Sequence, residues 1–293
     1  MSPYLTRLPE FLPGPLGGHP IFSYGVMLGI AFMLGWGLTV FLAEKEGYDK
    51  DLSGNTLFVA IVGALIGARL FFFFSATDQP LTLSNFLKFS EGGMVAYGGY
   101  IGGLVSAWAY MKWKGANFMA FVDIATPTLA LGLGIVRVGC FLYGCDYGLI
   151  GEGHASLHFP QWDDPGVAEW IRGNAPAFDA HSREGLLQAG IPMASAPVYP
   201  TQLIASVFGF ALFGALLLFR RFKKFDGQVL MYFLIAYSVF RFLIEFQRGD
   251  LNRGVGWFGT PFSTSQLIAI ALIVFAAGAL YLLGRREKLK ENS

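Results

Sequence analysis

Charged residues are scarce in this 293-residue chain. Asp, Glu, Lys and Arg together make up 14% of it, whereas an ordinary soluble domain carries about 25%. Hydrophobic residues make up 54%, which predicts an integral membrane protein. The formal net charge is only +1 and no long basic tract is present, so we expect no nucleic-acid partner.

Cysteine and histidine are also scarce. The two cysteines, Cys140 and Cys145, lie five positions apart, which indicates no disulfide framework. The four histidines lie elsewhere in the chain. His154 and His158 could share a helix face, but two histidines without further ligands are more typical of a polar loop. We therefore expect neither a metal site nor a cofactor.

Long apolar segments are abundant, and a membrane-spanning helix needs about 20 mostly apolar residues. The sequence predicts an all-α integral membrane protein, a single polytopic domain over residues 1–293 with about seven transmembrane helices. The predicted spans cover residues 22–43, 54–75, 94–112, 118–137, 201–219, 228–247 and 263–284. Glycines in the third span should bend or loosen it, and residues 80–93 could form a partly re-entrant or interfacial element.

The distribution of lysine and arginine predicts the orientation of the chain, because cytoplasmic loops carry an excess of both. With seven spans, twelve basic residues fall in loops on one side and five on the other. This places the C-terminus in the cytoplasm and the N-terminus outside it. The longest polar segment, residues 149–200, then lies outside, and its aromatic and scattered apolar residues predict a small ordered cap near the membrane surface.

Three arginines, Arg69, Arg137 and Arg241, lie within or at the edge of predicted spans. An arginine at the centre of a membrane helix costs roughly 2.5–3.5 kcal/mol, so it needs a partner, and such residues often mark a substrate site. The predicted topology places all three toward the outer half of the membrane.

The span 228–247 carries a dense polar pattern. Tyr237, Arg241, Glu245 and Arg248 follow one another at helical spacing and should share one helix face. Arg241 and Glu245 could simply pair within the helix and cancel their charges. Even a neutral pair within a membrane marks a bundle interior or a wet cavity, so we favour a functional site.

The run from Arg137 to Gly148 combines a cation with glycines that allow unusual backbone angles and close approach to a ligand. A cation beside exposed backbone amides suits a phosphate group, although the same run could be a glycine-rich helix exit with a snorkelling arginine. Pro200, Thr201 and Gln202 open the next span. They could cap its first turn, and Gln202 could also reach a lipid headgroup.

Six pieces of the chain together resemble the prolipoprotein diacylglyceryl transferases. Each piece alone is weakly specific, but their order and spacing extend through nearly the whole chain. The pieces are Tyr24-Gly-Val-Met, Gly67-Ala-Arg-Leu70, Gly93-Met-Val-Ala-Tyr-Gly-Gly99 followed by Tyr-Ile-Gly-Gly103, Arg137-Val-Gly-Cys-Phe-Leu-Tyr-Gly-Cys-Asp-Tyr-Gly148, Tyr199-Pro-Thr-Gln-Leu203 and Phe240-Arg-Phe-Leu-Ile-Glu-Phe-Gln-Arg248.

The resemblance implies a seven-span transferase of the bacterial inner membrane. Such an enzyme transfers the diacylglyceryl group of phosphatidylglycerol to the lipobox cysteine thiol of a prolipoprotein, forming a thioether and releasing glycerol phosphate. The family's essential arginines correspond to Arg137 and Arg241, and its early motif tyrosine to Tyr24. With Glu245 orienting Arg241, and Tyr24 or Tyr97 orienting lipid or proton, these five are the predicted catalytic residues. Predicted phosphatidylglycerol-binding residues are Arg69, Gly98, Gly99, Arg137, Gly148, Gln202 and Arg248.

The chain departs from parts of the family pattern. Some members carry a histidine, proposed as a base, where this chain has Tyr97, and an asparagine and an acidic residue where it has Cys140 and Cys145. A tyrosine of pKa near 10 is a poor base at neutral pH unless a cation lowers that pKa. Two alternatives therefore remain open: a family relative acting on another lipid or acceptor, and a lipid or anion transporter using the same cations.

Overall fold

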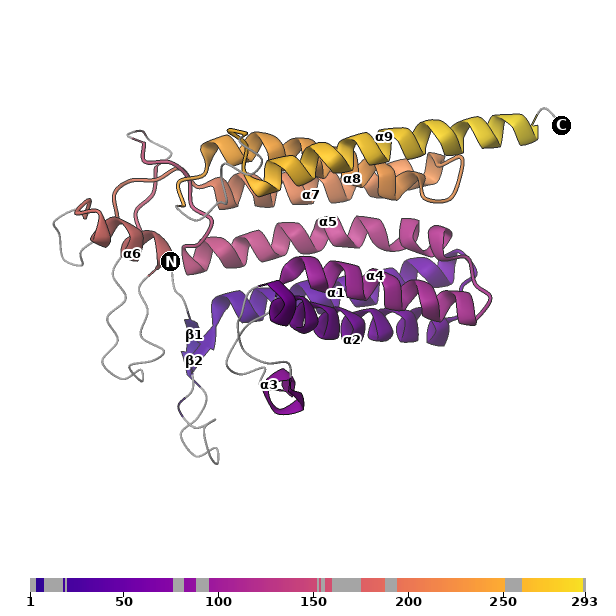
Figure 1. Cartoon of the computed structure of the whole chain (residues 1–293), viewed down its shortest axis with the longest axis horizontal. Coiled ribbons are helices and arrows are strands. Elements are labelled where there is room, and N and C mark those ends of the chain that lie inside the picture. The colour runs from indigo at the N-terminus through magenta and orange to yellow at the C-terminus, as the bar shows by residue number, and fades with distance from the viewer. Residues whose placement is uncertain are drawn as a thin grey trace. The chain divides into compact units, whose positions relative to one another are not determined.

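The computed structural model describes residues 4–7, 18, 20–75, 82–87, 95–151, 153, 156–159, 175–187, 194–250 and 260–291. The regular structure of these residues is helical apart from one two-stranded hairpin (Figure 1). The chain divides into two compact units, one of Met1–Gly35 with Thr126–Ser293 and one of Trp36–Ala125. Helices α1 (Ser23–Lys45) and α5 (Phe118–Tyr143) contribute residues to both units.

The second unit, Trp36–Ala125, is built around α2 (Lys50–Ser75) and α4 (Ala96–Trp113). A Cβ atom added to any of four glycines would overlap backbone or side-chain atoms of the facing helix, so these residues allow the two helices to approach closely. The four are Gly63, Gly67, Gly98 and Gly102. Contrary to the expected bend or loosening, the glycines leave α4 continuous because they serve its packing against α2.

Two further features complete the second unit. The short helix α3 (Leu83–Leu87) falls within residues 80–93, the expected re-entrant or interfacial element, of which the structure describes 82–87. A buried cluster joins the end of α1 and the start of α5 to α4. Its fully buried members are Ala43, Met111, Phe121 and Ile124.

The first unit begins with the antiparallel hairpin of β1 (Tyr4–Arg7) and β2 (Pro20–Phe22), which leads directly into α1. Its bundle also contains α7 (Thr201–Phe219), α8 (Gln228–Ile244) and α9 (Thr264–Glu291), with α8 contacting both of the others. Two single 3-10 turns, η3 (Arg220–Phe222) and η4 (Glu245–Gln247), follow α7 and α8. The core of this bundle includes Ala130, Leu212, Leu216, Val229 and Phe233.

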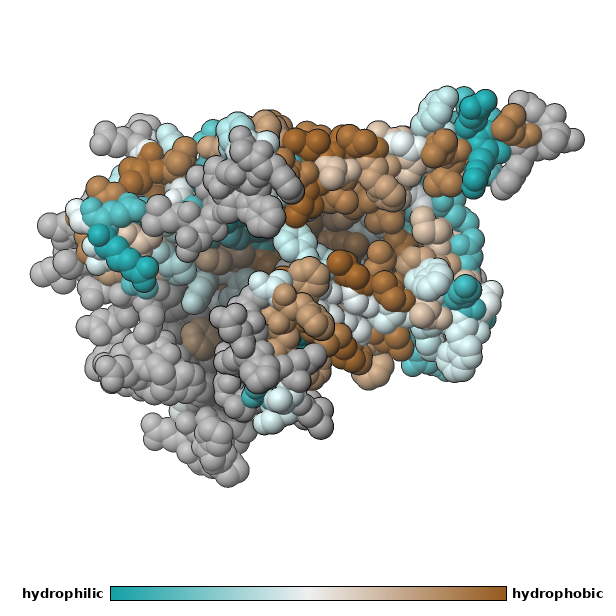
Figure 2. Space-filling model, in the orientation of Figure 1, coloured by the Kyte–Doolittle hydropathy of each residue, from teal (hydrophilic) through white to brown (hydrophobic). Residues whose placement is uncertain are grey.

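Six described helices are long and apolar enough to cross a membrane: α1, α2, α5, α7 with η3, α8 with η4, and α9. Helix α4 overlaps the remaining predicted span, but its glycines, tyrosines and tryptophans make it less apolar and it is not one of the six. Large apolar side chains are exposed along these helices. In Figure 2 the surface along α9 is hydrophobic over much of its length and hydrophilic near its C-terminal end. These features confirm the prediction of an all-α integral membrane protein.

The polar segment 149–200 is described in part. It contains α6 (Pro176–Arg183), and a buried cluster packs α6 against the flanking chain. The cluster includes Tyr147, Phe159, Ala175, Ala177, Phe178 and Val198. His154 lies outside the described residues, and His158 bonds to the carbonyl of Ser195 at 3.0 Å. Hydrophobic side chains therefore give the described part of this segment a small core of its own.

Candidate active site

The exit of α5 brings an acidic residue back toward a basic one. The helix continues to Tyr143, beyond the predicted end at residue 137, so Arg137 lies within its last two turns. Gly144 then adopts a left-handed conformation with φ of 81°, and its N–H and that of Cys145 both donate to the Cys140 carbonyl. This reversal allows the carboxylate of Asp146 to pair with Arg137.

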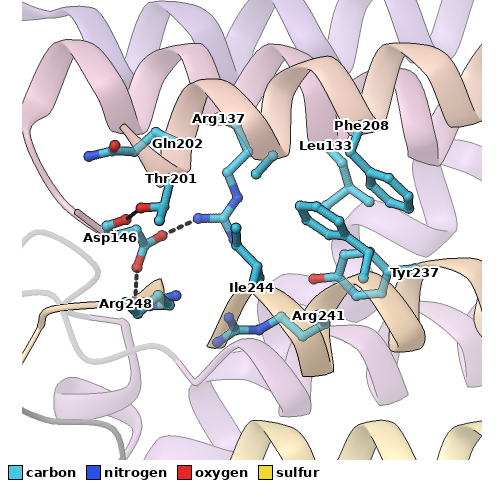
Figure 3. A pocket seen from close by; sticks show the side chains of 12 residues that line it. Leu133, Arg137, Asp146, Thr201, Gln202, Phe208, Tyr237, Arg241, Ile244 and Arg248 are labelled. Carbon is cyan, nitrogen blue, oxygen red and sulfur yellow. Dashed lines mark hydrogen bonds and ion pairs between the residues drawn. The ribbon is translucent and has the colours of Figure 1, made fainter. Parts of the chain in front are cut away.

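Asp146 bridges two arginines that are far apart in sequence. Its two carboxylate oxygens accept hydrogen bonds from Arg137 Nη1 and Arg248 Nη2 (Figure 3). Burial raises the pKa of Asp146, but the charges and hydrogen bonds of the two guanidinium groups outweigh it and hold that pKa below its usual range. The Asp146 carboxylate is therefore ionised at neutral pH.

Two further carboxylates complete the charge network. Asp250 accepts from Arg248 Nε at 2.8 Å and from Arg248 Nη2 at 2.6 Å, and Glu245 Oε2 lies 2.7 Å from Arg241 Nη1. Glu245 is almost fully buried, with 2% of its surface exposed. The expected Arg241–Glu245 pair is thus present, and in this network three guanidinium groups face three carboxylates.

Arg248 reaches the network by a route that the helical spacing did not predict. Helix α8 ends at Ile244, and Arg248 follows η4 in an extended conformation, so it is not part of the helix that carries Tyr237 and Arg241. It forms an isolated antiparallel bridge with Gly148. A Cβ on Gly148 would overlap the carbonyl oxygen of Tyr199, which explains why glycine is needed at this crossing.

The start of α7 holds the loop that carries Asp146. Thr201 Oγ1 donates to the Asp146 carbonyl at 2.7 Å, and Gln202 Nε2 donates to the Cys145 carbonyl at 2.8 Å. These side chains therefore bind a neighbouring loop, and neither caps the first turn of α7. Gln202 is 1% exposed, and its Oε1 has no hydrogen-bond partner in the described part of the chain.

These residues line a cavity with two chemically different ends. Arg137, Asp146, Thr201, Gln202, Arg241 and Arg248 form the polar end, and Leu133, Phe208 and the ring of Tyr237 form the apolar end (Figure 3). The hydroxyl group of Tyr237 points toward the polar end (Figure 3). The cavity is therefore suited to an amphipathic ligand that carries an anionic group.

Asp146 also lines a second cavity. Its described lining comprises Phe22, Tyr24, Gly25, Cys140, Tyr143, Cys145 and Asp146. Both thiols are free, and Cys140 Sγ lies 3.8 Å from Asp146 Oδ2 and 3.9 Å from Arg137 Nη1. Asp146 is thus a common wall of both cavities, and the predicted site residue Tyr24 belongs to the second one.

Cys140, Cys145 and Asp146 each place one ligand atom within 4.8 Å of the others. A soft metal ion prefers thiolate ligands, which these cysteines could supply. However, two guanidinium groups already engage the Asp146 carboxylate, and their positive charge opposes a cation here. The arrangement therefore favours an anion over a metal ion.

The other predicted site residues belong to the second unit. Arg69 is buried there and donates to the carbonyls of Asn85 and Phe86, at 2.7 and 3.1 Å, which ties α2 to α3. Tyr97 is 44% exposed in the first turn of α4, and Gly98 packs against α2. The structure gives Arg69 and Gly98 packing roles, and lipid binding by Arg69, Gly98 and Gly99 stays a prediction.

Asp146 is the site residue that sequence reasoning missed. It lies within the glycine-rich run from Arg137 to Gly148, of which the sequence predicts only Arg137 and Gly148 as site residues. The available signal was its position as the sole carboxylate between Arg137 and Gly148. An arginine within a predicted membrane span needs a counter-charge, so this carboxylate is the natural candidate for the partner of Arg137.

Comparison with known proteins identifies the family. The family model described as prolipoprotein diacylglyceryl transferase matches residues 15–282. A phosphatidylglycerol–prolipoprotein diacylglyceryl transferase of Clostridium tetani is 29% identical over 259 residues, which is 88% of this chain and 92% of that protein. Proteins of the same name from Clostridioides difficile and Neisseria meningitidis are 28% and 27% identical, over 93% and 88% of this chain and 95% and 92% of their own lengths. This chain therefore belongs to the prolipoprotein diacylglyceryl transferase family and is a multi-pass membrane protein.

Proposed function

We propose that this protein transfers the diacylglyceryl group of phosphatidylglycerol to the thiol of a prolipoprotein's lipobox cysteine. The products are a thioether-linked lipid and glycerol phosphate. The observation that carries this proposal is the two-ended cavity, with three guanidinium groups at one end and apolar side chains at the other (Figure 3). A phospholipid matches this cavity, because it carries an anionic phosphate group next to apolar acyl chains.

The reaction is a displacement at the glycerol carbon that bears the phosphoester oxygen. The acceptor sulfur, as thiolate, forms a bond to this carbon while the carbon–oxygen bond breaks. The leaving glycerol phosphate keeps the electron pair and gains a second negative charge, which balances the proton lost by the thiol. Arg137 and Arg241 stabilise this charge, and removing one such donor typically costs about 3–4 kcal/mol of activation free energy.

The remaining side chains orient the reactants. Glu245 holds the guanidinium group of Arg241, which it contacts at 2.7 Å. Gln202 Oε1, which has no partner among the described residues, accepts a hydrogen bond from a hydroxyl group of the glycerol headgroup. Tyr24, in the wall of the second cavity, or Tyr97 orients the lipid or the transferred proton. The reaction needs no metal ion or organic cofactor.

The proposed location is the bacterial inner membrane, with the N-terminus extracytoplasmic and the C-terminus cytoplasmic. The lysines and arginines of the α7–α8 connection and of the end of α9 support this orientation. Phosphatidylglycerol then enters from the outer leaflet. The segment 149–200 then lies on the extracytoplasmic side, as the predicted cap.

The proposal is tested by complementing the loss of a known transferase with this chain, and by incubating purified protein with labelled phosphatidylglycerol and a lipobox peptide. Mass spectrometry should detect a peptide that has gained a diacylglyceryl group and release of glycerol phosphate. Lys223→Ala, which changes a cation of the α7–α8 connection, should retain full transfer. Absence of the thioether product from well-folded protein would refute the proposal.

The same preparation separates the two alternatives. A lipid or anion transporter would move its substrate across a liposome membrane without changing it chemically, which a flux assay beside the product analysis would detect. A family relative with another acceptor or lipid would be inactive on the lipobox peptide but active on a different thiol or phospholipid.

A further inference from the structure

Among the described residues, the charges of the site are already balanced. Arg137, Arg241 and Arg248 contribute three positive charges, and Asp146, Glu245 and Asp250 contribute three negative ones. A phosphodiester that simply entered this site would add one uncompensated negative charge. Because such a charge is costly in a partly buried site, the phosphate must compete with the carboxylates for the guanidinium groups.

Asp146 is the carboxylate placed to leave. Of the three carboxylates, Asp146 is the one that lines the cavity among the described residues. Glu245 is buried and pairs with Arg241, and Asp250 pairs with Arg248 but does not line the cavity. Its two oxygens each hold one guanidinium group, Arg137 on one side and Arg248 on the other (Figure 3). A phosphodiester also carries one negative charge and two terminal oxygens, so it can replace the carboxylate without changing the net charge.

The structure also provides a place for the displaced carboxylate. Asp146 borders the second cavity as well as the first, and Tyr24 and the two thiols line that second cavity with it. Its backbone is fixed, because Thr201 bonds to its carbonyl and its φ of 56° lies in the left-handed region that aspartate tolerates. A rotation of the side chain alone is therefore enough to move its charge from one cavity to the other.

We propose that Asp146 is a positioning residue that occupies the phosphate site in the resting protein. It holds Arg137 and Arg248 at a spacing suited to a two-oxygen monoanion, and the lipid phosphate binds by displacing it into the second cavity. When the product leaves, the carboxylate returns and competes with glycerol phosphate for the same guanidinium groups. This inference rests on the proposed function in one respect: that function identifies the displacing anion as the phosphate of phosphatidylglycerol.

The test measures binding of glycerol phosphate to the full-length protein in detergent, by calorimetry or by thermal shift at constant ionic strength. Asp146→Asn removes the internal competitor and should bind glycerol phosphate about tenfold more tightly than the natural protein. Asp250→Asn removes the same charge from Arg248 without clearing the cavity, so it measures the charge effect alone and should strengthen binding clearly less than Asp146→Asn does. Equal or weaker binding by Asp146→Asn would overturn the proposal.

A folding defect does not remove the test. If Asp146→Asn unfolds without an anion, excess inorganic phosphate should restore its stability, and chloride at the same ionic strength should not, because phosphate supplies the missing bridging oxygens. Lack of rescue would show that Asp146 is needed only for folding. Asp146→Ser should behave like Asp146→Asn.

Kinetics give a second readout that a purely structural role would not produce. Asp146→Asn should lower KM for phosphatidylglycerol and, because product release slows, should also lower kcat. A rise in KM would contradict the proposal. The binding measurement needs no transfer reaction, so a protein that lacked transferase activity could still support or refute this role of Asp146.

Discussion

The two units compensate buried arginines in different ways. In the first unit, Arg137 and Arg248 share a carboxylate that lines a cavity, so another anion can replace their partner. In the second unit, Arg69 donates to two backbone carbonyls of α3, which belong to the chain itself and line neither of the two cavities in the described part of the structure. An exchangeable partner is typical of a binding site, and a backbone partner is typical of a structural tether.

The largest expected effect is on transfer activity. Arg137→Ala and Arg241→Ala should each lower kcat/KM about 10²–10³-fold, because each removes a donor that stabilises the leaving phosphate. The assay is thioether formation per folded protein, with folding checked by thermal unfolding. If both variants keep nearly the kcat/KM of the natural protein, the guanidinium groups of the first unit do not stabilise the leaving phosphate. The proposed functional difference between the arginines of the two units would then be wrong.

Arg69→Met should affect stability and leave activity largely intact. It removes charged hydrogen bonds to the carbonyls of Asn85 and Phe86, each worth about 1.5–3 kcal/mol. We expect a lower free energy of unfolding and faster proteolysis around α3, with kcat per folded molecule within a few-fold of the natural value. A selective rise in KM for phosphatidylglycerol would instead support the prediction that Arg69 binds the lipid.

Gly98→Ala tests whether the second unit depends on close helix packing. The added Cβ would overlap the backbone of Gly67 and should destabilise the protein by about 1–3 kcal/mol. Gly99→Ala is the matched control, because its Cβ would lie 3.5 Å from the nearest atoms, an ordinary contact, and should be neutral or slightly stabilising. Equal melting temperatures for the two variants would contradict this packing role.

The smallest expected effect is on the pH dependence of stability, through His181 in the polar segment 149–200 of the first unit. His181 is buried against Tyr147, and its Nδ1 has no hydrogen-bond partner among the described residues. Burial lowers the pKa of His181, although nearby Glu184 opposes the shift. Since the neutral form is favoured in the folded protein, stability should be full above the ordinary pKa of 6.5 and should fall as the pH drops below it.

Thermal unfolding at several pH values between about 7.5 and 5.5 measures this dependence. The matched variant His181→Phe, which cannot be protonated, should show a flatter profile over this range. An identical slope in both proteins would mean that other groups dominate the pH response.

Most of the helices could be predicted because each is a long apolar run, and the Arg241–Glu245 pair because it follows helical spacing. The end of α5 was placed too early, since the apolar residues after Arg137 continue the helix until Gly144. The Asp146–Arg248 contact joins residues 102 positions apart, through a crossing that depends on tertiary structure alone. No local pattern in the sequence carries such information.

The hydrogen bonds around Gly148 have a consequence for the segment 149–200, whose length can differ between related proteins. Gly148 N–H donates to the Tyr199 carbonyl at 3.0 Å, and Tyr199 N–H donates to the Leu149 carbonyl at 3.1 Å. The segment 149–200 thus begins and ends at the same place, and its two ends are hydrogen-bonded to each other. Insertions are tolerated where the flanking chain closes in this way. Evolution can therefore lengthen or replace this segment as an interchangeable module while the guanidinium groups behind it keep their geometry.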